Sequence, residues 1–125
     1  MTNTYNSKDR DTLDVPSFDC TGWSFSVTPK DQSSGRFILL IIARAECQNA
    51  LVEFFEAQQE KSAKDRSYVT ATDDKGSSIQ LTVTKEDMAV RSDGRKFELI
   101  ATMENKDLRK NTSIIQGKTQ CSTII

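Results

Sequence analysis

The residue types that most often carry chemistry in proteins are scarce in this sequence. Its 125 residues include no histidine, which removes the commonest general base, the commonest metal ligand and the usual pH switch. The three cysteines, Cys20, Cys47 and Cys121, form no CxxC pair, so neither a zinc knuckle nor a thioredoxin-type redox site is indicated. We therefore expect no metal and no cofactor, and we expect three free thiols in a reducing compartment.

Carboxylates offer the remaining route to acid–base chemistry or cation binding. Four glutamates share one predicted helix, at positions Glu46, Glu53, Glu56 and Glu60. No histidine accompanies them, so a solvated helix face is the favoured interpretation. Asp73-Asp74 and Asp93-Gly94 lack the spacing of a calcium loop and lie where hairpins need a turn,.

Nucleophile and nucleotide motifs are absent as well. The sequence contains no GxSxG or SxxK, and it contains neither GxGxxG nor GxxxxGK[ST],. Cys47 lies on the apolar stripe of the predicted helix, where burial makes a thiol inert,. We expect no catalytic residues and a protein that is not an enzyme.

The charge pattern argues against nucleic acid as the partner. There are 17 basic and 18 acidic residues, a net charge of −1, whereas duplex binders carry a basic excess. The balance hides an asymmetry, because residues 1–60 hold 5 basic and 9 acidic residues and residues 61–125 hold 12 and 9. Such a distribution suits self-association, in which a basic tail meets the acidic helix of a neighbour.

One apolar run and one amphipathic segment dominate the middle of the chain. Phe37–Ala43 is apolar throughout, which is typical of a central strand covered on both faces, although a buried helix gives the same pattern. The segment 46–63 places Cys47, Leu51, Phe54 and Phe55 on one stripe, which predicts an amphipathic helix.

Several other segments alternate polar and apolar residues with a period of two. They are 23–28, 68–72, 78–84, 88–91 and 96–103,. The predicted fold class is α+β, with one amphipathic helix packed on a mostly antiparallel sheet of five or six strands and extended N- and C-terminal arms. The second sheet face is rich in Thr and Ser and either stays wet or meets another subunit.

The arms are the predicted interaction elements. We expect residues 1–21 to form a polar N-terminal arm, residues 22–104 a single α+β domain and residues 105–125 a C-terminal arm. The C-terminal arm either adds a strand to a neighbour or is a frayed tail. The spaced apolar anchors of the two arms are the candidate interface residues: Leu13, Val15, Phe18, Ile114, Ile115, Ile124 and Ile125.

These features favour a non-enzymatic interaction or assembly protein. We expect self-association through the arms and sheet edges, as in a small structural or accessory component of a larger particle, including viral ones. The alternative is a small inhibitor or ligand-binding module that acts on a protein target. The first ten residues lack the apolar stretch of a secretion signal,, and Phe37–Ala43 is too short to cross a bilayer. No membrane partner is expected, and the expected location is the cytoplasm, or the virion if the protein is viral.

Overall fold

The computed structural model describes residues 4–30 and 35–105. The elements follow one another as β1 (Tyr5–Asn6), η1 (Ser7–Asp9), β2 (Thr12–Asp14), β3 (Ser24–Pro29), β4 (Arg36–Arg44), η2 (Ala45–Cys47), α1 (Gln48–Glu60), η3 (Ala63–Asp65), β5 (Val69–Thr72), β6 (Ser78–Val83), β7 (Ala89–Ser92) and β8 (Lys96–Asn105). The apolar run in the middle of the sequence is therefore a strand, which decides between the two alternatives that its periodicity left open.

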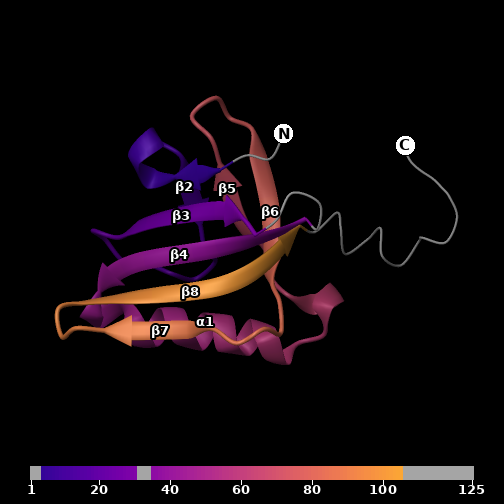
Figure 1. Cartoon of the computed structure of the whole chain (residues 1–125). Helices are drawn as coiled ribbons and strands as arrows, with labels where there is room; N and C mark the ends of the chain where they lie inside the picture. Colours follow the sequence, from indigo (N-terminus) through magenta and orange to yellow (C-terminus); the bar gives the residue numbers. More distant parts are fainter. Residues whose placement is uncertain (1–3, 31–34, 106–125) are drawn as a thin grey trace, which may run out of the picture.

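The strands form one antiparallel sheet that curls into a nearly closed barrel (Figure 1). The order along the sheet is β1-β3-β4-β8-β6-β5-β2, and β7 also pairs with β8. Strand β8 pairs with β4 along one edge from Lys96 to Glu104, and its other edge is shared between β7 and then β6. Strands β7 and β6 therefore occupy successive parts of the same edge of β8. The sheet continues from β6 through β5 to β2, which forms the wall of the barrel opposite β4 and β8.

The N-terminal segment closes most of the remaining gap. Tyr5 and Asn6 pair with β3, and Thr12 to Asp14 pair with β5, so the two outermost strands of the sheet lie within ten residues of each other in the chain. The backbone N–H of Asn6 donates to Asp11 Oδ2 at 3.0 Å, which joins the two short strands.

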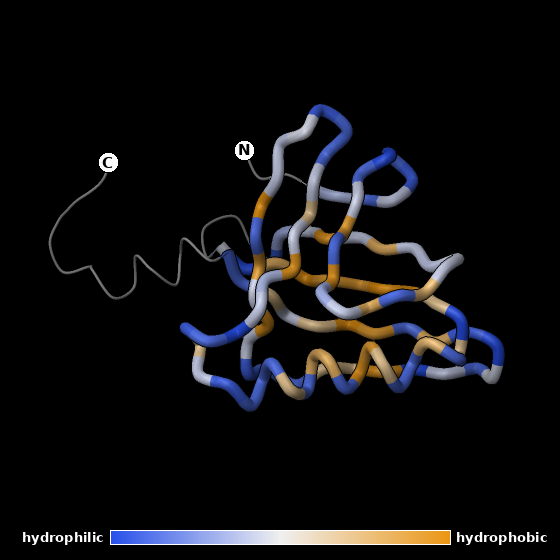
Figure 2. The backbone as a smooth tube through the Cα atoms, turned by 180° about the vertical axis from the view of Figure 1, so that it is seen from behind, coloured by the Kyte–Doolittle hydropathy of each residue, from blue (hydrophilic) through white to orange (hydrophobic). Residues whose placement is uncertain are grey.

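Helix α1 runs along the lower side of the barrel in Figure 1, and its hydropathy alternates along the tube in Figure 2. Leu51 and Phe55 on its inner face are fully buried. The guanidinium of Arg66 fixes the end of the helix, because it donates to the carbonyls of Gln58 at 2.8 Å and of Val83 in β6 at 3.0 Å. The bond to Val83 ties the segment after α1 to β6, and the bond to Gln58 adds a second donor to a carbonyl that already accepts from the Lys61 N–H at 3.2 Å,.

The predicted fold class is wrong in its architecture. The described part of the chain has eight strands rather than five or six, and they close into a barrel with one short helix instead of lying open beneath it. The N-terminal arm is the physical reason: Tyr5, Leu13 and Val15 are buried in the core of their own chain. Their apolar area offsets the ordering entropy of a segment whose polar composition suggested an extended arm.

Candidate interaction surfaces

The outer side of β4 is apolar between its two terminal arginines, and β8 adds one apolar residue, Ile100, between the polar Glu98 and Thr102. Along β4, residues with odd numbers point inward and are at most 4% exposed, as for Phe37. The even-numbered residues point outward, and the three apolar ones among them are half-buried whereas the arginines at the two ends are exposed. Ile100 of β8 lies opposite Leu40 on the same side. We call this group the outer apolar face: Ile38, Leu40, Ile42 and Ile100. In Figure 1 nothing crosses in front of β4 and β8, and α1 runs below them, behind β7.

Charged residues of both signs border the outer apolar face. Arg36 lies opposite Glu104 at one end. At the other end Glu98 lies directly opposite Ile42, and the Glu98 Oε1 atom lies 3.8 Å from Arg91 Nη1. Both signs are therefore present at each end of the face, and Arg44 opposite Lys96 adds positive charge beyond Glu98.

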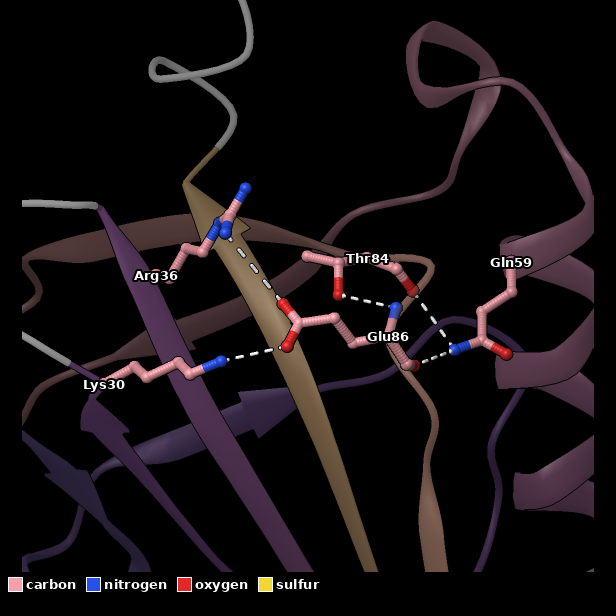
Figure 3. A network of polar contacts seen from close by, with 5 residues as sticks. All are labelled: Lys30, Arg36, Gln59, Thr84 and Glu86. Carbon is pink, nitrogen blue, oxygen red and sulfur yellow. Dashed lines mark hydrogen bonds and ion pairs between the residues drawn. The ribbon is translucent and has the colours of Figure 1, made fainter.

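A polar network holds the β6–β7 connection against the Arg36 end (Figure 3). Glu86 accepts from Lys30 Nζ at 2.9 Å and lies 4.0 Å from Arg36. The Gln59 side-chain amide of α1 donates to the carbonyls of Thr84 and Glu86 at 3.1 and 2.8 Å. The hydrogen bond from Lys30 and the charges of Lys30 and Arg36 hold the pKa of Glu86 below its ordinary 4.5, while lost hydration acts in the opposite direction,.

Strand β7 presents a second surface, which is a sheet edge. It pairs only with β8 in the described structure, and all four of its residues are exposed. Val90 is 38% exposed, and it is the most exposed large hydrophobic residue among those that the structure describes. An edge strand of this kind leaves backbone N–H and C=O groups available to another strand.

The expectation of three free thiols is wrong for Cys20 and Cys47, which the structure joins in a disulfide. Their Cα atoms are 6.3 Å apart, within the usual range for such a bond. The sequence gave no sign of this, because the pair is 27 residues apart and only the fold brings the segment after β2 next to η2. Cys121 lies outside the described residues.

A cavity of about 380 Å³ lies beside this disulfide, lined by Phe18, Asp19, Cys20, Thr21, Arg44, Glu46, Cys47 and Ala50. Two of its charged groups are paired with each other: Arg44 Nη1 lies 3.4 Å from Glu46, and Arg44 Nη2 donates to Thr21 at 3.2 Å. The side chains of Arg44 and Glu46 are both more than half exposed.

The residues that the sequence singled out for binding have different positions in the fold. Leu13 and Val15 are buried in their own chain, and Phe18 packs edge-on against Trp23 with ring centres 5.4 Å apart. The four isoleucines of the C-terminal arm, Ile114, Ile115, Ile124 and Ile125, lie outside the described residues. A role of any of these residues in binding stays a prediction, and for Leu13 and Val15 it requires the N-terminal segment to leave the barrel.

The carboxylates considered for chemistry have simpler surroundings. Asp73 accepts from the backbone N–H groups of Lys75 and Ser77, and Asp93 accepts from those of Arg95 and Lys96, which confirms the turn interpretation. The two backbone bonds lower the pKa of Asp93 below its ordinary 3.8,. Glu53, Glu56 and Glu60 on α1 are exposed. No three potential metal ligands come together within the described ranges.

Comparisons with known proteins do not identify a function for these surfaces. No protein-family model, no curated protein and no solved structure matches this chain. Among the described residues, no helix has the length and apolarity required to span a membrane.

Proposed function

We propose that this protein is a non-enzymatic assembly protein that self-associates through its outer apolar face. The observation that carries the proposal is strand β4, which is apolar on both faces although its own core covers only one. Parallel or central strands with such continuous apolar runs are usually buried on both sides. Leu40 and Ile100 stand directly opposite each other near the middle of the face, where a cover removes most apolar area from water,.

A second copy of the chain suits this face because of its border. In a two-fold contact the same patch meets itself, so a border of one sign would repel its own copy. Here Arg36 opposes Glu104 and Arg91 accompanies Glu98. The border therefore holds both signs, and the orientation of the two copies that keeps their Arg44–Lys96 ends apart avoids a cluster of like charge,.

The proposed role is a small structural or accessory component of a larger particle. Of the two locations expected from the sequence, a particle outside the reducing cytoplasm suits the Cys20–Cys47 disulfide better,. The proposed partners are protein, with further copies of this chain first among them.

The test is the mass of the full chain in solution, measured by light scattering over a range of concentrations. The double variant Leu40→Thr with Ile100→Thr places a β-branched, strand-favouring residue in both strands but removes the apolar centre of the face. We expect the natural sequence to form at least a dimer and the double variant to have a lower mass. The matched control is Thr70→Ser with Thr72→Ser, on the outside of β5, and it should leave the mass unchanged.

A natural sequence that stays monomeric at high concentration would contradict the proposal, as would a folded double variant of unchanged mass. Circular dichroism of each variant separates loss of association from loss of folding.

A further inference from the structure

The outer edge of β7 has a definite pattern of free backbone groups. The backbone N–H of Asp93 donates to the Lys96 carbonyl at 3.1 Å, so this closing pair of the β7–β8 hairpin is a hydrogen-bonded pair. Antiparallel ladders alternate hydrogen-bonded and non-hydrogen-bonded pairs. Arg91 and Glu98 therefore form the next bonded pair, whereas Val90 and Ser92 direct their N–H and C=O groups away from β8.

The side chains of β7 also have a definite arrangement. Val90 lies opposite Leu99, which is fully buried, so Val90 stands on the inner side of the sheet at the margin of the core. Arg91 lies opposite Glu98 on the outer side. The edge therefore offers an incompletely covered apolar residue on one side and a charge that is already paired on the other.

We propose that this edge pairs antiparallel with the same edge of a second copy, with Val90 opposite its own counterpart. In this register the two Val90 residues form a bonded pair, and the buried row of each barrel continues from Leu99 through Val90 into the neighbour,. Arg91 lies opposite the small Ala89 of the other copy. Moving the two-fold axis by one residue would place Arg91 directly opposite its own copy, and that arrangement is destabilising.

This contact goes beyond the proposed function, because Val90 and Ser92 are not part of the outer apolar face. The two contacts use different sides of the protomer, so together they link copies into assemblies larger than a dimer. Loss of one contact leaves the other intact, which makes the two proposals separately testable.

Proline at position 90 tests the edge selectively. Val90→Pro removes an N–H that points away from β8, so the β7–β8 ladder keeps its own hydrogen bonds,. The matched control is Val90→Thr, which retains the N–H and the branched side chain. In the full chain, at equal concentration, we expect Val90→Pro to have a lower mass than Val90→Thr, that of the dimer formed through the outer apolar face. Equal masses for two folded variants would overturn the proposal.

Hydrogen exchange of the natural sequence gives a second measurement that does not depend on how the proline variant folds. Protection of the Val90 and Ser92 amides should rise with protein concentration, while the Arg91 amide, already bonded to β8, should change little. The same rise should persist in the Leu40→Thr, Ile100→Thr variant. Protection at Val90 and Ser92 that does not depend on concentration would overturn the proposal, whatever becomes of the outer apolar face.

Discussion

Two walls of the same barrel differ in the residues that they turn toward solvent. The wall formed by β2 and β5 turns Leu13, Val69 and Ala71 inward. Its outward residues are polar: Thr12, Asp14, Thr70 and Thr72. The wall formed by β4 and β8 buries its inward residues equally well, yet its outward positions include the outer apolar face. A barrel wall exposed to water requires only the first pattern, so the second wall carries apolar area beyond what its own core uses.

The largest expected effect comes from two neighbouring leucines on β4. Leu39 is fully buried, so Leu39→Ala should lower the free energy of unfolding by about 2–5 kcal/mol,. Leu40 is half-buried on the outer side, and Leu40→Ala should change the unfolding of a dilute monomer far less while weakening association. Urea unfolding, with mass measured in parallel, separates these roles. Similar losses of stability at both positions in dilute solution would show that the outer side of this wall belongs to the fold alone.

A smaller effect is expected from the disulfide, and it should fall on the other wall. The bond between Cys20 and Cys47 ties the chain that follows β2 to the start of α1. Cys20→Ser with Cys47→Ser removes a cross-link that closes a loop of 27 residues, and links of this kind typically contribute about 2–4 kcal/mol.

Hydrogen exchange locates this effect. We expect the amides of β1 and β2 to lose protection before those of β4 and β8, because β1 and β2 have only two and three paired residues,. The single variant Cys121→Ser is the matched control. Uniform loss of protection across the sheet would mean that the barrel opens as one unit and that its two walls do not differ in this respect.

The long elements of the barrel could be predicted from the sequence because each carries its own periodicity. The alternation at 78–84 and 96–103 corresponds to β6 and β8, and Asp93-Gly94 makes the turn between β7 and β8. Closure of the barrel could not be predicted. Strand β1 has two residues and β2 has three, so neither is long enough to show a period, and their polar surroundings resemble a free arm.

The candidate interaction surfaces could be predicted only in part. The apolar run of β4 indicated that both of its faces would be covered, and the fold then showed which face is not. The edge of β7 carries no such signal, because its four residues do not differ in sequence from an exposed segment next to a turn. Only their pairing with β8 identifies them as an edge strand. Arg66 was missed for a similar reason: the carbonyls that it binds, from Gln58 and Val83, come together only when α1 meets β6.

The smallest expected effect concerns the charged border of the outer wall. Lys30 and Arg36 lower the pKa of Glu86 in the folded state, so the folded protein favours the carboxylate,. The stabilisation is fully present above the ordinary pKa of 4.5 and is lost as pH falls through the lower pKa of the folded state,. Glu86→Gln removes it. The difference in urea midpoint between the natural sequence and this variant should therefore be positive at pH 7 and shrink toward zero in acid. Glu56→Gln, an exposed position on α1, controls for the loss of one charge, and an equal pH dependence in both variants would place the effect in net charge rather than in the Lys30–Glu86–Arg36 contacts.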